Sequence, residues 1–258
     1  MRKTKIEWTG YSWNPLSGCF HKCPYCYARS IARRFASKNI AGSLIEAKTS
    51  CGDAVCELDS PVVSGGKKEP YPFGFLPTFH RYRLDEPQKL RGSQTIFVCS
   101  MADLFGEWVP DRIIGEVFEA CRKAPQHRYL FLTKNPQRYE ELSQKGILRW
   151  NDIFWCGTTY PGNISRLWIP AKNPVFWSCE PILRPWTTED DRALHEAWPE
   201  WVILGAETGN RKDKVVPKKE WVDHIVRMCG DMGITVFMKD SLIPIVGEEN
   251  MIRRFPFT

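Results

Sequence analysis

Three cysteines near the N-terminus are the residues of this chain whose type and spacing most directly indicate chemistry. Cys19, Cys23 and Cys26 follow the pattern C-x3-C-x2-C, and Tyr25 directly precedes the last of them. An iron–sulfur cluster is normally held by four thiolates. Three closely spaced thiolates can bind three irons of a 4Fe–4S cluster and leave the fourth iron to a ligand that the protein does not supply. We therefore interpret these cysteines as metal ligands.

Two other interpretations of the cysteine loop need to be weighed. A structural zinc site usually takes two pairs of ligands at finger-like spacing, and His21, inside the loop, is the only extra ligand nearby. A disulfide would leave one cysteine of the three unpaired. A non-catalytic zinc-binding module stays the alternative to an iron–sulfur site.

Length and composition favour a single domain that covers residues 1–258. The chain has 43% hydrophobic residues, enough for one large core. We find no apolar run that could cross a bilayer and no signal-peptide core after Met1, which predicts a cytoplasmic protein. Ten cysteines in such a compartment indicate thiols and metal ligands and not a disulfide scaffold. The net charge of +6 is compatible with a polyanionic partner without requiring one.

Short apolar runs alternate with amphipathic stretches along the chain. The predicted strands have the composition of strands buried on both faces and cover Ser12–Ser17, Thr95–Ser100, Arg128–Thr133, Ile153–Thr158, Val175–Cys179, Trp201–Ala206 and Thr235–Met238. Helical spacing of apolar residues is seen in three places, around Ala28–Phe35, Ile113–Cys121 and Trp221–Cys229. Asn135 and Pro136 indicate an N-cap and first helical position, and Gly146 a helix end.

This alternation predicts an α/β fold with right-handed βαβ units and a parallel sheet. We expect a partial, open (β/α)6-type barrel with an additional C-terminal strand, in which chemistry gathers at the carboxyl ends of the strands. The segment 39–92 is rich in proline and glycine and lacks periodicity. We predict an irregular insertion there, with one extra strand at Thr78–Leu84.

The cysteine loop with its aromatic residue resembles the signature of the radical S-adenosylmethionine (SAM) superfamily. Further blocks make the chain similar to a phage-associated radical SAM-like family whose role is mostly unassigned, and more remotely to spore photoproduct lyase. These blocks are Lys3–Thr9, Trp13–Pro15, Arg83–Pro87, Ser100–Phe105, Leu132–Pro136, Cys179–Pro181 and Gly205–Gly209. The resemblance runs to about Lys239, although this family often spaces its cysteines differently.

The resemblance implies a 4Fe–4S cluster, SAM as its ligand and a set of SAM-binding residues. In the superfamily the reduced cluster cleaves SAM to methionine and a 5′-deoxyadenosyl radical. Tyr25 would lie beside the adenine, and Ser100 and Asp103 would hold the amino group. Residues that end the next three strands would reach the carboxylate and the ribose hydroxyls, namely Lys134, Thr158 and Glu180. In the alternative, structural reading Asp103 is a turn residue, Lys134 a solvated charge and Glu180 a partner of an arginine.

Three further residues are candidates for the substrate side of the pocket. Glu207 and Lys239 follow the last strands, and the Cys179 thiol could donate a hydrogen atom to a radical. Burial in apolar strands favours core packing for Cys179, and equally for Cys156. Cys51 and Cys56 in the insertion are too few for a second metal site, and we expect free thiols there.

Basic residues form four clusters, which carry the prediction of a nucleic-acid partner: Arg29, Arg33, Arg34 and Lys38; Arg81, Arg83, Lys89 and Arg91; Arg211, Lys212, Lys214, Lys218 and Lys219; and Arg253 and Arg254. We expect the second and third clusters to lie near the pocket mouth, beside aromatic residues. A substrate base would have to leave its stack to meet a buried radical. Solvated surface charge, and a peptide or small-metabolite substrate, stay open. The resemblance also implies a reductase such as flavodoxin or ferredoxin.

Overall fold

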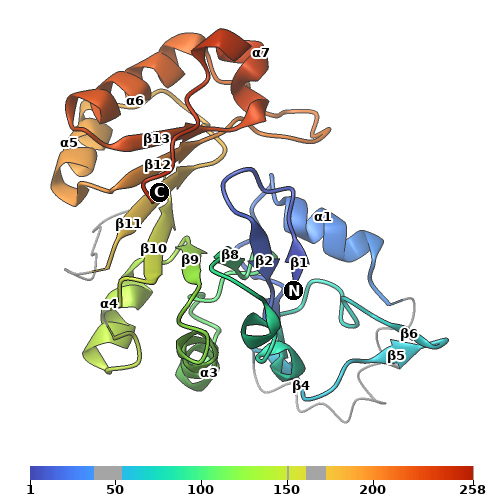
Figure 1. Cartoon of the computed structure of the whole chain (residues 1–258). Helices are drawn as coiled ribbons and strands as arrows, with labels where there is room; N and C mark the ends of the chain where they lie inside the picture. Colours follow the sequence, from blue (N-terminus) through green and yellow to red (C-terminus); the bar gives the residue numbers. More distant parts are fainter. Residues whose placement is uncertain (38–53, 150, 161–172, 258) are drawn as a thin grey trace.

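The computed structural model describes residues 1–37, 54–149, 151–160 and 173–257. Its main feature is an eight-stranded sheet in the order β1-β2-β8-β9-β10-β11-β12-β13. Only the edge strand β1 is antiparallel to its neighbour, and the other seven strands are parallel. The sheet curls into a half-barrel (Figure 1). The predicted α/β class and open, partial barrel are therefore confirmed.

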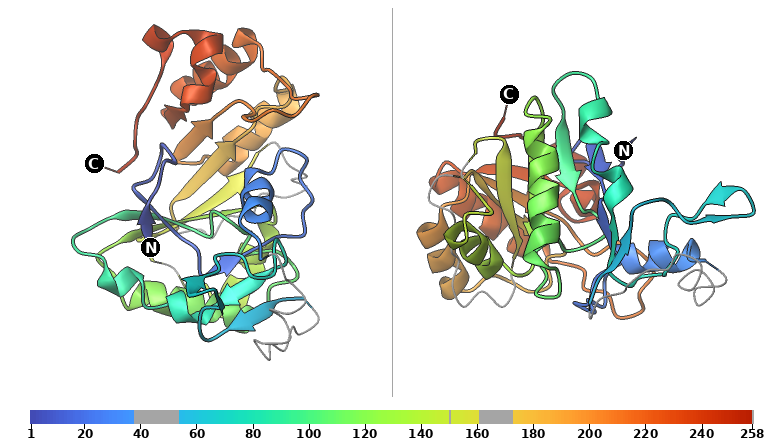
Figure 2. Two further views of the ribbon diagram at one scale, coloured as in Figure 1. Left: turned by 90° about the vertical axis from the view of Figure 1, so that its right-hand side faces the viewer. Right: turned by 90° about the horizontal axis from the view of Figure 1, so that it is seen from below.

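The elements follow one another in a regular βα alternation. The strands of the large sheet are β1 (Arg2–Lys3), β2 (Tyr11–Trp13), β8 (Thr95–Val98), β9 (Arg128–Thr133), β10 (Phe154–Thr159), β11 (Val175–Cys179), β12 (Trp201–Leu204) and β13 (Thr235–Met238). The described α-helices are α1 (Tyr27–Arg34), α3 (Asp111–Arg122), α4 (Gln137–Gln144), α5 (Thr188–Ala197), α6 (Lys219–Asp231) and α7 (Ile243–Val246). Helices α3 to α6 lie on the outer side of the curled sheet, whereas α1 lies apart from them (Figures 1 and 2).

Three strand predictions match the observed bounds and the others shift by a few residues. The predicted strand Ser12–Ser17 is divided, because Asn14 and Pro15 separate β2 from β3 (Leu16–Ser17), which joins a different sheet. Proline lacks the N–H that a ladder needs. Sequence periodicity missed α5, whose start is a capping box formed by Thr187 and Asp190. Helix α4 begins one residue later than predicted, with Pro136 as its N-cap.

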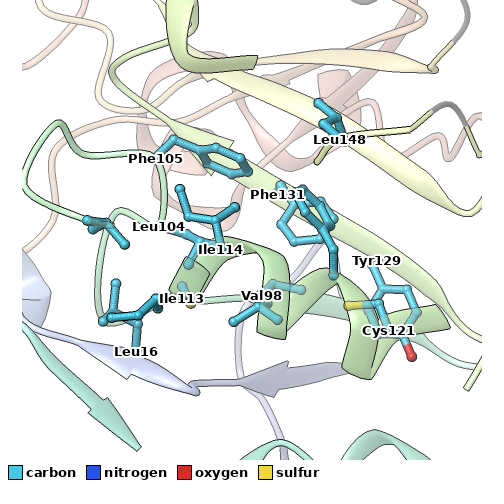
Figure 3. Close-up of a cluster of buried hydrophobic side chains, with 14 of the residues drawn as sticks. Leu16, Val98, Leu104, Phe105, Ile113, Ile114, Cys121, Tyr129, Phe131 and Leu148 are labelled. Atoms are coloured by element: carbon cyan, nitrogen blue, oxygen red, sulfur yellow. The ribbon is translucent and has the colours of Figure 1, made fainter. Parts of the chain in front are cut away.

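Alternation along the strands separates two apolar layers. One set of side chains packs outward against the helices, as Val98 and Phe131 do against α3, which contributes Cys121 to the same cluster (Figure 3). The other set fills the lower part of the barrel interior with large rings and aliphatic groups, namely Trp8, Phe97, Leu130, Trp155, Phe176, Trp201, Ile203 and Phe237. Because successive residues of a strand point to opposite faces, the residues two positions beyond this inner layer also point inward.

The insertion is more regular than predicted. Its described part contains β4 (Cys56–Leu58), β5 (Val63–Ser64), β6 (Lys67–Lys68) and β7 (Thr78–His80). Strands β3, β7 and β4 form a small sheet, and β5 pairs with β6. The predicted strand Thr78–Leu84 ends early, at His80, where a 3-10 turn over Arg81–Arg83 begins.

Two remaining predictions concern cysteines and membranes. Cys56 is disulfide-bonded, so the expectation of a free thiol there is wrong, and Cys51 lies outside the described residues. The other eight cysteines are free. Among the described residues, we find no helix with the length and apolar character that a membrane span requires.

Candidate functional site

A cavity of about 670 Å³ opens at the carboxyl ends of the parallel strands. The cysteine loop, the start of α1 and the N-terminal segment of residues 4–8 close it from the sides, and residues that follow six of the strands line its floor. Cys19, Cys23 and Cys26 all line this cavity. The fold thus brings the predicted metal ligands to the edge of the sheet where α/β barrels carry their chemistry.

The pleat of the sheet selects which side chains reach the cavity. Leu132 and Lys134 continue the inward face of β9, Ser178 and Glu180 that of β11, and Lys239 that of β13, and all five line the cavity. The inward position after β12 is a glycine, Gly205. A Cβ there would lie 3.2 Å from Lys239 and 3.3 Å from Glu180, so its absence leaves room for both side chains.

The cysteine loop is fixed to the end of β8 through Asn14 and Gly18. The side-chain oxygen of Asn14 accepts hydrogen bonds from the Ser100 hydroxyl (3.2 Å) and the Met101 N–H (3.0 Å). The Gly18 N–H donates to the Met101 carbonyl at 2.9 Å. Gly18 has a φ of +85°, and a Cβ on it would lie 2.2 Å from the Leu76 carbonyl oxygen. Only glycine fits this approach of two chain segments.

The thiols of the loop are partly engaged by backbone groups. The Cys26 sulfur accepts a hydrogen bond from the Arg29 N–H and caps α1, and the Cys19 sulfur accepts one from the His21 N–H. Burial raises the pKa of Cys19 to about 12. In the described ranges no three His, Cys, Asp or Glu side chains are grouped as ligands of one metal ion. The fit to a cluster therefore rests on the donor set, three free thiols on one cavity.

Asp103 is the central hydrogen-bond acceptor of the site. Its Oδ1 accepts from the Phe105 N–H (3.0 Å) and the Thr133 hydroxyl (2.7 Å). Its Oδ2 accepts from the Lys134 N–H (2.9 Å) and lies 2.7 Å from Nε2 of His21. The side chain is only 7% exposed. Asp103 thus ties the ends of β8 and β9 to the cysteine loop, and its lone pairs are occupied by the protein itself.

Tyr25 and Lys134 meet across the cavity. The Lys134 ammonium lies 3.2 Å from the Tyr25 hydroxyl and 5.3 Å from the centre of its ring. The contact holds the Tyr25 ring at a defined place beside the ends of the strands. An ammonium over an aromatic face contributes about 0.5–1 kcal/mol at a partly exposed site.

Glu180 and Lys239 form an incompletely satisfied pair at the other side of the cavity. The Lys239 ammonium lies 3.4 Å from Oε1 of Glu180, and the two side chains are 24% and 20% exposed. Burial raises the pKa of Glu180, and Lys239 opposes that rise. Among the described residues neither this oxygen nor the indole N–H of buried Trp8 completes a well-formed hydrogen bond, although Trp8 and Lys239 both lower the pKa of Glu180. Unsatisfied buried polar atoms on a cavity wall are a feature of a ligand site.

Glu207 lines the cavity but is already paired. Arg211 donates two hydrogen bonds to its carboxylate, at 2.6 and 2.7 Å. These bonds lower the pKa of Glu207, whose side chain is 2% exposed. The pair closes the loop after β12. Both oxygens of Glu207, which was predicted to be catalytic, are therefore already engaged by Arg211.

Two predicted site residues do not reach the cavity. Thr158 is buried, and its hydroxyl points to the Thr133 carbonyl oxygen at 3.4 Å. Strand β10 extends to Thr159, and this residue lines the cavity instead. Cys179 lies on the outer face of β11, fully buried in the layer against α5 and α6, so the catalytic candidate is a core residue. Cys156 packs in the core as predicted.

Several cavity residues escaped prediction from the sequence. They include Trp8, Asn14, His21, Thr159 and Ser178. Counting alternate positions onward from the large inward side chains Trp155 and Phe176 identifies Thr159 and Ser178. Asn14 could be found in the same way, as the residue directly after β2. His21 could be found from its position inside the cysteine motif, whereas the place of Trp8 depends on how its loop folds.

The second basic cluster does not lie at the cavity. Arg81 forms ion pairs with three carboxylates, those of Glu57, Asp59 and Glu116. The Arg83 guanidinium donates to the Asn14 carbonyl oxygen at 3.0 Å. None of the four residues of this cluster lines the cavity, and Arg81 joins the insertion to α3 through Glu116.

Comparisons with known proteins identify a family but no characterised relative. The model of the family described as "Protein of unknown function (DUF5131)" matches residues 3–242. No curated protein matches the chain. No solved structure matches it. Because the match covers the half-barrel and every residue of the cavity, this chain belongs to the DUF5131 family.

Proposed function

We propose that this protein is a radical SAM enzyme whose substrate is a nucleic-acid base or modified nucleotide. The observation that carries the proposal is the position of three free thiols with C-x3-C-x2-C spacing on one cavity at the carboxyl ends of a parallel half-barrel. Cys19, Cys23 and Cys26 would hold a 4Fe–4S cluster. When bound, that cluster supplies the electron that cleaves SAM.

The residues around the cavity have the chemistry to hold SAM. The Ser100 hydroxyl donates to Asn14 and keeps its own lone pairs for an ammonium. Asp103 is the less suitable partner for that ammonium, because four protein donors already occupy its carboxylate. Tyr25 offers a ring face for an adenine. Glu180 would accept hydrogen bonds from hydroxyl groups of the ligand, because its Oε1 completes no hydrogen bond among the described residues.

Water exclusion and positioning are the contributions of the other groups. The inner apolar layer under the cavity seals it from below. The Lys239 ammonium orients the Glu180 carboxylate. The Glu207–Arg211 pair positions the loop after β12 at the cavity wall. A radical-generating site needs such a dry, rigid surrounding to prevent side reactions.

Anaerobic reconstitution of the full chain with iron and sulfide tests the proposal. We expect about four irons and four sulfides per chain, broad visible absorption, and cleavage of SAM to 5′-deoxyadenosine in the presence of dithionite. Cys23→Ala should abolish the absorption and the cleavage, and Cys229→Ala, in the core away from the cavity, should retain both. Colourless protein with one zinc per chain, or SAM cleavage retained in Cys23→Ala, would refute the proposal.

Addition of candidate substrates separates the substrate classes. We expect DNA, RNA or nucleotides, and not peptides, to stimulate SAM turnover and to transfer deuterium into 5′-deoxyadenosine. Stimulation by peptides alone would contradict the nucleic-acid part of the proposal and leave the radical SAM part standing.

A further inference from the structure

The four basic clusters differ in how far the protein neutralises them. Arg81 pairs with three carboxylates, and Arg253 contacts those of Asp240 and Glu248. In the third cluster Arg211 pairs with Glu207 and Lys219 with Asp223, and Asp213 lies among the remaining lysines. Cations that already have carboxylate partners gain less from an added anion. Three clusters are therefore wholly or partly compensated within the protein.

The surface formed by the cysteine loop and α1, which we call the α1 face, is different. Its cations are Lys22, Arg29, Arg33 and Arg34, and residues 18–37 contain no Asp or Glu. Among the described residues none of these four side chains forms an ion pair with a carboxylate. Lys22, Arg33 and Arg34 are exposed, so the α1 face carries four uncompensated positive charges beside the cavity.

Aromatic rings lie exposed among these cations. Phe20, Tyr27 and Phe35 are 41%, 50% and 54% exposed. Phe35 continues the apolar spacing of α1, but its ring faces solvent. The Arg29 guanidinium lies 5.0 Å from the centre of the Phe75 ring, which lines the cavity. Aromatic and cationic groups thus continue from the cavity wall onto the outer surface.

We infer that the α1 face binds single-stranded nucleic acid and leads one base into the cavity. This inference rests on the proposed function and deepens it by naming the surface that holds the substrate backbone. Uncompensated Arg and Lys bind phosphates, and exposed rings offer stacking faces to unpaired bases. A duplex keeps its bases stacked and cannot use the rings, which is why the single strand is the better complement.

An acidic protein is the competing partner for a basic surface, and it predicts a different result. If the α1 face bound an acidic protein such as flavodoxin, removing its positive charges would weaken the binding of that protein. The chain would then show no preference for single strands over duplex. The experiment therefore measures both partners on the same variants.

The test is the salt dependence of oligonucleotide binding to the full chain, without SAM or reductant. Fluorescein-labelled 20-nucleotide DNA and RNA single strands and a DNA duplex are titrated between roughly 50 and 200 mM salt. We expect the single strands to bind more tightly than the duplex. Whichever of the DNA and RNA single strands has the higher affinity identifies the type of nucleic acid. Arg33→Gln/Arg34→Gln should reduce the slope of log K against log salt by about 1.4, since each phosphate contact contributes about 0.7.

Matched variants separate this surface from charge in general. Arg253→Gln/Arg254→Gln removes the same charge from a cluster partly paired with carboxylates and should leave the slope unchanged. Phe35→Ala should weaken single-strand binding at least about fivefold, the lower limit for one stacked base. Trp198→Ala, which removes an exposed ring at the C-cap of α5, should not weaken it.

Several results would overturn the inference. The unmodified chain would bind no oligonucleotide, or it would bind duplex as tightly as single strands or more tightly. The two double variants would show equal changes of slope. Alternatively, Arg33→Gln/Arg34→Gln would lose flavodoxin binding while its oligonucleotide binding is unchanged. Iron content and SAM cleavage are measured separately, so failure here with intact SAM chemistry would leave the radical SAM assignment standing.

Discussion

Replacing Asp103 by Asn tests whether this carboxylate holds the site together. Oδ1 accepts from the Phe105 N–H and the Thr133 hydroxyl, and Oδ2 meets the Lys134 N–H and His21. An amide keeps one acceptor oxygen and replaces the other with a donor. The remaining oxygen can keep its two bonds, whereas the new NH2 group faces the N–H of Lys134 and leaves it without a partner.

The expected loss follows from these bonds. A hydrogen bond to a charged group contributes about 1.5–3 kcal/mol, and an unsatisfied buried donor costs about 1–3 kcal/mol. We expect Asp103→Asn to lower the free energy of unfolding by about 3 kcal/mol, or the Tm by roughly 6–12 °C in a chain of this size. Urea unfolding followed by circular dichroism measures it. Asp152→Asn, an exposed carboxylate, is the control and should stay within about 0.5 kcal/mol.

The same variant distinguishes the two roles considered for this residue. If Asp103 instead held the amino group of SAM, the Asn variant would unfold like the unmodified chain and lose only SAM affinity. A stability change below about 1 kcal/mol would refute the reasoning from its four hydrogen bonds.

Gly18→Ala should destabilise the chain by at least about 2 kcal/mol in urea unfolding, and Gly66→Ala, with positive φ but open space, by no more than about 1 kcal/mol; equal losses would contradict the close-approach argument. Because Arg211 lowers the pKa of Glu207, their pair stabilises the fold at pH values above 4.5, the ordinary pKa of a glutamate. That contribution is lost as the pH falls through the lowered pKa. Glu207→Gln should therefore be less stable than the unmodified chain at pH 7 and approach it below pH 4.5, and a gap independent of pH would count against this. Tyr25→Phe should retain SAM affinity in equilibrium dialysis of reconstituted protein, whereas Tyr25→Ala should lose about two- to tenfold; equal losses would exclude stacking.

Much of the half-barrel could be predicted because its signals are local. Strands β9, β11 and β13 begin and end where composition placed them, since each is a short apolar run bounded by polar residues. The metal-ligand candidates were also local, because their spacing lies within one loop. Helix α5 was missed because its apolar face is narrow and Leu194 and Asp190 are its only buried residues.

The site residues likewise divide into those that local sequence signals identified and those that they misplaced. Lys134, Glu180 and Lys239 were identified because they follow strands directly, and the carboxyl ends of parallel strands meet at one edge. Thr158 and Cys179 were misplaced because one residue of register turns a side chain to the opposite face. The partners of Asp103 and Arg81 depend on which segments of the chain approach one another, whereas Arg211 lies only four positions from Glu207.

The amino-acid sequence alone determined the α/β alternation, the parallel sheet and the cysteine loop, because these depend on residue type and on spacing over a few positions. Only the tertiary structure decided which groups remain available to a ligand. The Asp103 oxygens are engaged by residues between 2 and 82 positions away, and those of Glu207 by Arg211, four positions away. By contrast, no carboxylate among the described residues pairs with the cations of the α1 face. For Asp103 and for the α1 face, compensation depends on contacts between segments far apart in the chain, which short spacings do not encode.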